Sequence, residues 1–373
     1  MAQDDPEIIE PAASAKRDFP CRACGAELAF VPGTKAIACA FCGEENPIPG
    51  ADEEFAILEH GYEEWRRRLE ELEKSRPHET AESVECDSCK ALIDNPREIA
   101  SFLCPYCNAP MVLEERREDR VRPESLLPFR ITHDQAVRAF RTWLGNLWFA
   151  PGKLARYARS DGALEGLYLP YWTYDSNTVS HYTGQRGDHY YTTSTSRVNG
   201  RTVTTRQRHT RWTSASGTVH VAFDDVLVPA SRTLPRKDLD ALAPWDLGNL
   251  VPYASEYLAG FRAERYQVDL VPGFDDARGI MDVGIRSAVR RDIGGDEQRI
   301  STLDTTHRDV KFKHLLLPLW VSAYRYRDKV YRFLVNARTG EVRGERPWSA
   351  WKIFFFVTTI LLILAALFFV FAG

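Results

Sequence analysis

The sequence lacks the short motifs that mark the commonest catalytic sites. It contains no G-x-x-x-x-G-K-[ST] loop for nucleotide phosphates, no G-x-S-x-G nucleophile turn, no H-E-x-x-H metal motif and no G-x-G-x-x-G dinucleotide turn. Its formal net charge is −4, so the chain as a whole has no basic signature of a nucleic-acid-binding protein. These absences favour a non-enzymatic protein, and we predict no catalytic residues.

A secretion signal is also missing. The first residues are acidic and lack the apolar segment that a signal peptide needs, so we expect residues 1–17 to form a disordered acidic tail. The eight cysteines would then remain in a reducing compartment, where metal binding is favoured over disulfide bonds.

All eight cysteines belong to an internal repeat. Two Cys-x-x-Cys pairs separated by 14 residues occur at residues 21–42 and again, 65 residues later, at residues 86–107. Two thiolates three positions apart can hold one zinc ion from a tight turn, and a second such turn completes a tetrahedron. The sequence therefore predicts two structural Zn²⁺ ions, in zinc ribbons at residues 18–49 and 82–113. The predicted ligands are Cys21, Cys24, Cys39, Cys42, Cys86, Cys89, Cys104 and Cys107.

A charged segment joins the two ribbons and predicts a helix over residues 52–76. Its apolar residues alternate in steps of three and four, which is the spacing of a heptad seam. The seam residues are Phe55, Leu58, Tyr62, Trp65, Leu69 and Leu72. Two interpretations stay open: the seam packs on a ribbon or on the next domain, or it binds a partner helix, including a second copy of the chain in a homo-oligomer.

Residues 123–347 predict an α+β domain with antiparallel sheets. An L-x-L-P-x-W motif occurs at residues 167–172 and again at 315–320, each time after a segment with helical periodicity. The matching order of elements indicates a duplicated β-α-β-β unit. The first helix would begin after Thr132, which forms a capping box with the residue three positions later. A predicted strand at residues 266–271 would open the second copy.

A basic hairpin lies between the two copies, at residues 180–213. Asn199-Gly200, between two Thr-rich alternating segments, is a strong signal for a β-hairpin turn. Its arginines are Arg186, Arg197, Arg201, Arg206, Arg208 and Arg211, and Asp188 is the only acid. The hairpin is either a solvated arm or a contact surface for an anionic partner, such as lipid headgroups, an acidic protein or nucleic acid.

The last segment predicts a transmembrane helix at residues 351–372. From Ile353 to Ala372 there are 20 residues without a charge. At about 1.5 Å per residue, that length matches the roughly 30 Å hydrocarbon core of a bilayer. Basic residues precede it, which places the N-terminal bulk in the cytoplasm. We therefore expect a tail-anchored, single-pass protein of the bacterial inner (cytoplasmic) membrane.

Several motifs together resemble a known group of proteins. Besides the paired Cys-x-x-Cys ribbons, these are L-P-F-x-I at residues 127–131, the run from Trp143 to Pro151, L-P-Y-W at residues 169–172 and N-x-x-T-G at residues 336–340. The sequence resembles bacterial membrane-anchored zinc-ribbon proteins. These are often labelled "transcription factor IIB-type zinc ribbon" or "primosomal protein N′ (replication factor Y), superfamily II helicase".

The resemblance implies a recruitment role rather than an activity. Since the Walker A lysine and the DExx box of a helicase are absent, it does not extend to helicase chemistry. Related Gram-positive proteins are linked to membrane-stress complexes with phage-shock-type coat proteins and flotillin-like scaffolds. We therefore expect a multi-domain, non-enzymatic, cytosol-facing scaffold that binds a protein partner. The alternative is a membrane-tethered nucleic-acid-binding protein that uses the ribbons and the arginine-rich hairpin.

Overall fold

The structure is a computed structural model that describes most of the chain between Cys21 and Ala372. The described residues are 21–26, 28–34, 36–48, 58–75, 80–81, 83–85, 90–94, 101–103, 110–112, 116–117, 121–147, 164–198, 201–326, 329–345 and 349–372. The predicted acidic tail at residues 1–17 lies outside them.

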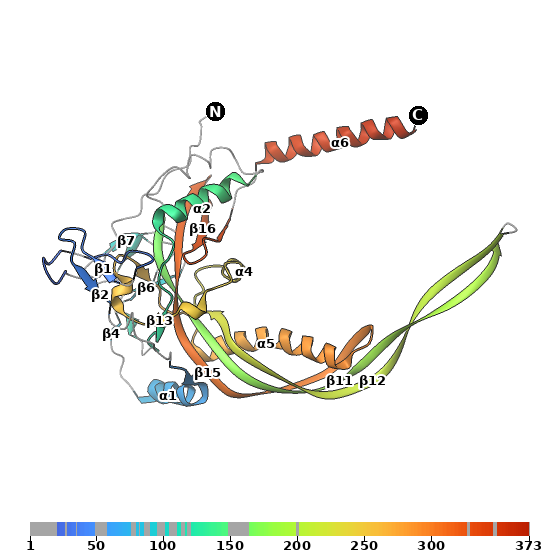
Figure 1. Ribbon diagram of the computed structural model, residues 1–373, viewed down its shortest axis with the longest axis horizontal. Helices are drawn as coiled ribbons and strands as arrows, with labels where there is room; N and C mark the ends of the chain where they lie inside the picture. Colours follow the sequence, from blue (N-terminus) through green and yellow to red (C-terminus); the bar gives the residue numbers. More distant parts are fainter. Residues whose placement is uncertain are drawn as a thin grey trace.

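One nine-stranded mixed sheet forms the centre of the molecule (Figure 1). Its main path runs in the order β12, β11, β15, β10, β13, and the other four strands pair at its margins. The bounds are β3 His60–Gly61, β10 Ser125–Leu126, β11 Glu165–Val198, β12 Arg201–Pro229, β13 Val251–Pro252, β14 Arg262–Ala263, β15 Glu297–Tyr326, β16 Lys329–Asn336 and β17 Val342–Gly344. Strand β11 is antiparallel to β12 and β15, whereas β10 is parallel to β15 and β14 is parallel to β11.

The two copies of the L-x-L-P-x-W motif lie side by side in this sheet. In the antiparallel pairing of β11 with β15, Leu169 is opposite Leu317, and these are equivalent positions of the repeat. Leu167 is opposite Leu319 in the same register, and all four leucines are buried. A local two-fold axis therefore relates the two motifs at the centre of the core.

Helix α5 (Leu270–Ile293) covers the concave face of the long strands (Figure 1). Its buried side chains recur every four residues at Ala277, Met281, Ile285, Val289 and Ile293. The indole Nε1 of Trp172 donates to the Val268 carbonyl at 2.8 Å, and the Tyr174 hydroxyl donates to the Leu270 carbonyl at 2.7 Å. Side chains of β11 therefore hold the first turn of α5, where Gly273 allows a close approach.

Helix α2 (His133–Gly145) begins at the predicted capping box. The Thr132 hydroxyl accepts from the Gln135 backbone N–H, and the Gln135 side chain accepts from the Thr132 backbone N–H. Phe140 stacks on Phe333 of β16, with ring centroids 3.7 Å apart. The described part of the domain also contains three short helices: α4 Arg236–Asp240, η1 Leu247–Asn249 and η2 Ser255–Leu258.

Strands β11 and β12 extend beyond the sheet as a two-stranded arm, which we define as Asp188–Val198 with Arg201–Arg211. Strand β15 pairs with β11 only as far as Gly187, opposite Glu297. From there β11 and β12 pair with each other without a register shift up to Val198 and Arg201. Figure 1 shows this arm curving away from the body. The predicted turn residues 199–200 lie outside the described residues.

Small hairpins and helix α1 (Tyr62–Ser75) lie beside the sheet. In the first ribbon β1 pairs antiparallel with β2, and in the second β5 pairs with β6 and β7 with β8. The bounds are β1 Ala36–Ala38, β2 Glu45–Pro47, β4 Thr80–Ala81, β5 Ser83–Glu85, β6 Leu92–Asp94, β7 Ser101–Leu103, β8 Pro110–Val112 and β9 Arg116–Arg117. The bridge between Ile93 and Glu264 connects the second ribbon's β6 to the central domain.

The structure corrects the predicted fold class. The central domain is one large mixed sheet, not a set of antiparallel sheets, because the short strands β10 and β14 pair in parallel with the long ones. Residues 266–269 do not form the predicted strand, because the carbonyl of Val268 accepts from a side chain instead of joining a ladder. The helix predicted at 52–76 begins at Tyr62, since His60–Gly61 pairs with β15 as β3.

The prediction of a transmembrane helix at residues 351–372 is also corrected. Helix α6 (Ala350–Ala372) forms there, but no helix among the described residues is long and apolar enough to cross a membrane. The same finding contradicts the predictions that depend on a span. These are the tail anchor, the membrane as a partner, and the single-pass inner-membrane location with the N-terminal bulk in the cytoplasm.

Candidate metal centre and basic arm

The first cysteine pair sits on a tight turn that backbone hydrogen bonds define. The N–H of Gly25 donates to the carbonyl of Cys21 at 2.9 Å, and the N–H of Cys21 donates to the carbonyl of Ala26 at 2.8 Å. Gly25 has φ +71°, in the left-handed region that favours glycine. The turn therefore places Cys21 and Cys24 on the same side of the chain.

The second pair repeats this turn 18 positions later. The N–H of Gly43 donates to the carbonyl of Cys39 at 2.9 Å, and the N–H of Cys39 donates to the carbonyl of Glu44 at 2.9 Å. Gly43 has φ +76°, matching the first turn. The second turn connects β1 to β2 in an antiparallel hairpin, and sulfur–sulfur contacts place it against the first turn.

The four sulfur atoms converge on one point. Sγ of Cys21 lies 3.6 Å from Sγ of Cys42, and Sγ of Cys24 lies 3.6 Å from Sγ of Cys39. All four sulfurs lie within 4.8 Å of one another, and the cysteines are not in disulfide bonds. A tetrahedral site with metal–sulfur bonds of about 2.3 Å has sulfur–sulfur edges of about 3.8 Å. The geometry is therefore compatible with a four-thiolate metal site, as the spacing predicts.

Asn46 supports this cluster, and the cysteine pattern did not identify it. The side chain is buried on β2, and its Nδ2 lies 3.7 Å from Sγ of Cys21. Its Oδ1 accepts from the backbone N–H of Arg22 at 3.1 Å, and Nδ2 also donates to the Glu44 carbonyl at 3.2 Å. Asn46 therefore links both turns. The equivalent position of the second repeat holds Met111, whose side chain has no N–H donor.

The backbone of each turn favours thiolate at the buried cysteines. The Cys24 backbone hydrogen bond is the main cause that lowers the pKa of Cys21, to about 6, and burial opposes it. The Cys42 backbone does the same for the pKa of Cys39. At Cys42 the Glu44 backbone lowers the pKa, but the neighbouring Cys24, burial and the other two sulfurs outweigh it and raise the pKa to about 12. Negative charges on neighbouring thiolates repel one another, and a cation bound between the sulfurs would relieve this repulsion.

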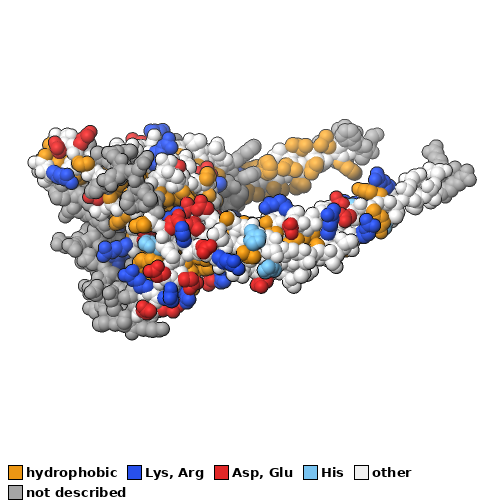
Figure 2. Space-filling view, turned by 60° about the horizontal axis from the view of Figure 1, so that its bottom comes forward, with side chains coloured by type: hydrophobic (Ala, Val, Ile, Leu, Met, Phe, Trp, Pro, Cys, Tyr) orange, Lys and Arg blue, Asp and Glu red, His pale blue; other side chains and the backbone are white. Residues whose placement is uncertain are grey.

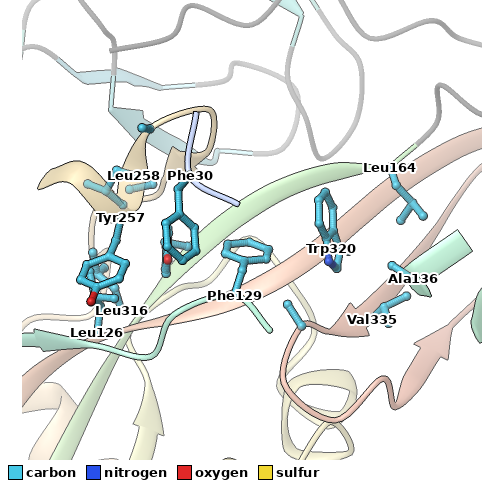
Figure 3. Close-up of a cluster of buried hydrophobic side chains, with 14 of the residues drawn as sticks. Phe30, Leu126, Phe129, Ala136, Leu164, Tyr257, Leu258, Leu316, Trp320 and Val335 are labelled. Atoms are coloured by element: carbon cyan, nitrogen blue, oxygen red, sulfur yellow. The ribbon is translucent and has the colours of Figure 1, made fainter. Parts of the chain in front are cut away.

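The first ribbon is fixed to the central domain by an aromatic contact. The backbone N–H of Phe30 donates to the Ala259 carbonyl at 3.0 Å, and that of Gly33 donates to the Phe129 carbonyl at 2.9 Å. The buried Phe30 ring lies 5.2 Å from Tyr257 between centroids, in the cluster drawn in Figure 3. The ribbon and the sheet therefore share one hydrophobic core.

The predicted ligands of the second ribbon, Cys86, Cys89, Cys104 and Cys107, lie outside the described residues. The described strands on either side of them do pair: Ser83 is opposite Asp94, and Ser101 is opposite Val112. Each predicted Cys-x-x-Cys pair thus falls in the connection of a hairpin. The second metal site stays a prediction from the repeat.

The predicted partner seam largely faces the interior of this chain. The Tyr62 ring lies 4.7 Å from Phe274 of α5, and the Trp65 ring lies 6.1 Å from Phe312 of β15. Leu69 packs against the same cluster, whereas Leu58 is exposed. Phe55 and the side chain of Leu72 lie outside the described residues. The described seam therefore follows the interpretation in which it packs on the next domain.

Cations gather along the arm, as Figure 2 shows where it leaves the body. The Arg206 guanidinium lies 3.8 Å from the centroid of the Tyr191 ring. Arg208 is directly opposite Tyr191 in the register, so these three side chains share one face. Arg186 pairs with Asp188 at 3.0 Å, and Arg211 is opposite Asp188. The side chains of Arg197 and Arg201 lie outside the described residues.

An acidic cluster at a bulge of β11 has a buried lysine as an ion-pair partner. Asp175, Asp224 and Asp225 bring their carboxylates together. The buried Lys313 places Nζ 2.6 Å from Oδ1 of Asp225, and Glu59 reaches the same lysine at 3.4 Å. Burial raises the pKa of Asp175. Because Lys313 pairs with Asp225 of this cluster and with Glu59 beside β3, we assign the cluster a structural role at the junction with β3.

Comparison with known proteins gives one distant relative. No family model matches the chain, and no solved structure matches it. The chain is similar to "Uncharacterized protein YdjG" of Bacillus subtilis (strain 168), with 24% identity over 337 residues, covering 90% of this chain and 91% of the relative. The likeness therefore covers nearly the whole length of both chains, and the printed name of the relative gives no activity.

Proposed function

We propose that the chain is a non-enzymatic zinc-binding scaffold that recruits a protein partner. The observation that carries the proposal is the closed geometry of the four-cysteine centre. Four thiolates fill the coordination sphere of Zn²⁺ and leave no position for a substrate or a water molecule. Such a site stabilises a small unit that could not bury enough apolar surface alone.

The attachment of the ribbon supports this role. Phe30 and the hydrogen bond to Ala259 connect the metal centre to the sheet that also carries the arm. A ribbon without contacts to the sheet could change its orientation relative to the rest of the molecule. Because this ribbon packs into the main core, its second Cys-x-x-Cys turn, where Phe41 is 81% exposed, has a fixed position relative to the central domain. This arrangement suits a surface that presents a constant shape to a partner.

The repeat extends the proposal to a second Zn²⁺, held by Cys86, Cys89, Cys104 and Cys107. These residues have the spacing of the first set, and the described strands beside them form matching hairpins. The resemblance to zinc-ribbon proteins in the sequence points the same way.

Affinity purification of the tagged full-length chain tests the scaffold role. We expect a protein that co-purifies in a fixed stoichiometry with the wild-type chain and is lost with Cys39→Ser, which opens the metal centre. The exposed Glu45→Ala is the matched control and should retain the partner. If no stoichiometric protein is recovered, or if Cys39→Ser retains it in full, the scaffold role is wrong.

A second candidate is nucleic-acid binding through the arm. The observation in its favour is that Arg206 and Arg208 share a face with Tyr191, a combination that can contact phosphates and bases. Such binding would weaken steeply as salt is raised. A gel shift with the full-length chain and single-stranded DNA at low salt tests it, and the absence of a shift would remove this candidate.

A further inference from the structure

The outer edge of β11 continues past the end of its partner strand. Strand β15 occupies this edge from Glu165 to Gly187 and begins at Glu297. From Asp188 to Val198, no strand in the described part of the chain pairs with that edge. A strand edge without a partner offers backbone N–H and C=O groups to an added strand.

The backbone groups at the start of this edge show which way it faces. The carbonyl of Gly187 accepts from the N–H of Asp296 at 2.8 Å, and the N–H of His189 donates to Oδ2 of Asp296 at 2.7 Å. Backbone groups of alternate residues point to the same edge of an antiparallel strand. The N–H and C=O groups of Tyr191, Thr193 and Thr195 therefore continue this row.

Two acids of this chain already occupy the first positions. Besides Asp296, the carboxylate of Glu297 accepts from Nε2 of His189 at 2.7 Å and from the Thr210 hydroxyl at 3.1 Å. The edge of β11 thus begins against two consecutive acids. The contacts of Asp296 and Glu297 show that carboxylate side chains can bind to this edge and to the adjacent face of the arm.

The rest of the arm has the opposite charge and no acid to neutralise it. Residues 189–210 contain no Asp or Glu. Arg206 reaches across from β12 to lie over the ring of Tyr191, which brings its positive charge toward the β11 side of the arm. Arg208 lies on the same face, directly opposite Tyr191. Hydroxyl side chains fill most of the remaining positions.

We propose that the β11 edge from Tyr191 to Val198 binds an extended acidic segment of a partner protein as an added strand, which continues the line of β15. The proposal rests on the recruitment role and names the chemistry of the partner. Main-chain hydrogen bonds would supply affinity, and the carboxylates of the added strand would pair with the arginines. A second copy of the arm fits poorly, because it would place arginines against arginines.

A synthetic peptide provides the probe. The full-length chain is titrated into a fluorescently labelled peptide of about ten alternating Glu and Thr residues, the length of a strand that could cover the arm. We expect saturable binding, and we expect it to be lost when Lys replaces Glu or when alternate peptide nitrogens are methylated. Binding that survives methylation would overturn strand addition. Stronger binding of oligo(dT) than of the peptide, or self-association of the chain that excludes the peptide, would overturn the proposed occupant.

A cross-strand pair supplies a matched pair of variants. Thr195 and Thr204 are opposite each other, and by the alternation their N–H groups point to the two different outer edges of the arm. Thr195→Pro removes a donor from the β11 edge and should weaken peptide binding roughly tenfold or more. Thr204→Pro removes one from the other edge and should leave binding within about twofold.

The peptide experiment can contradict strand addition without contradicting the scaffold role. Equal peptide binding by the two proline variants would contradict strand addition at β11, whatever Cys39→Ser does to partner capture. Circular dichroism and metal content of both variants check that the chain has folded. If Thr195→Pro alone unfolds, Thr193→Val with Arg206→Glu tests the face charge instead, and unchanged binding there would also contradict the proposal.

Discussion

The backbone N–H of Phe30 donates to the carbonyl oxygen of Ala259 at 3.0 Å, and the Phe30 side chain is buried beside this bond. A single residue of the ribbon thus makes both a polar and an apolar contact with the central domain. This contact makes the metal centre part of the main core, and it has direct consequences for stability.

Phe30→Ala should destabilise the protein strongly, because it leaves a cavity between the ribbon and η2. We expect the free energy of unfolding to fall by about 3–5 kcal/mol, measured by denaturant titration. The control is Phe41→Ala, a change to a ring that is 81% exposed in the same ribbon, with an expected effect within about 0.5 kcal/mol. Equal effects of the two changes would show that the ribbon does not share the central core.

Asn46→Ala should weaken metal binding at the first ribbon while leaving the four sulfurs in place. Asn46 contacts Sγ of Cys21 and the backbone of both turns, so its loss removes the support that orients the ligands. We expect zinc affinity to fall by about 10–100-fold in competition with a chelator. Glu45→Ala, an exposed change on the same strand, is the control. Unchanged affinity in Asn46→Ala would remove this role.

Gly273→Ala should loosen helix α5 from strand β11. An added Cβ would lie 2.5 Å from the Tyr174 hydroxyl and 2.9 Å from Trp172 Cδ1, so neighbouring side chains must move. We expect a loss of about 1–3 kcal/mol in the free energy of unfolding. Gly279→Ala lies on the same helix with nothing within 4 Å and should instead stabilise by up to about 1 kcal/mol. The same sign for both variants would contradict this packing.

The attachment of β3 and α1 to the sheet should weaken at acid pH, because it depends on the ion pairs of Glu59. Lys311 at 2.9 Å, helped by Lys313, holds the pKa of Glu59 below its usual value, which for a glutamate is 4.5. A carboxyl with a lowered pKa contributes stability above its unfolded pKa and loses it as pH falls through the folded pKa. We therefore expect hydrogen-exchange protection of α1 to differ between the wild type and Glu59→Gln near pH 6, and the difference to shrink as the pH falls below 4.5 and through the lowered pKa of Glu59. A difference that stays constant throughout an acid titration would contradict the ion-pair explanation.

The sequence predicted those parts of the molecule that depend on local chemistry. Cys-x-x-Cys followed by glycine predicts the two turns of the first ribbon, and the Thr132–Gln135 box predicts the start of α2, because each needs only neighbouring residues. The pairing of β11 with β12 likewise follows from the turn signal at residues 199–200, which leaves Val198 opposite Arg201.

Contacts between distant segments were not predictable from such signals. Nothing near Phe30 indicates that it packs on Tyr257, and nothing near Asn46 marks it as a contact of Cys21. The sheet is mixed because the short strands β10 and β14 pair in parallel with β15 and β11, and these pairings join segments that are distant in the sequence. The prediction of a membrane span at the end of the chain was wrong, since no helix among the described residues is long and apolar enough to cross a membrane.

Metal content tests the central claim most directly. The full-length chain, purified under reducing conditions without added metal, is analysed by mass spectrometry for zinc per chain, beside Cys39→Ser and Cys104→Ser. The account predicts two zinc ions in the wild type and one in each variant, because each substitution opens one closed site. A wild-type chain without zinc, or variants that both keep two ions, would contradict it.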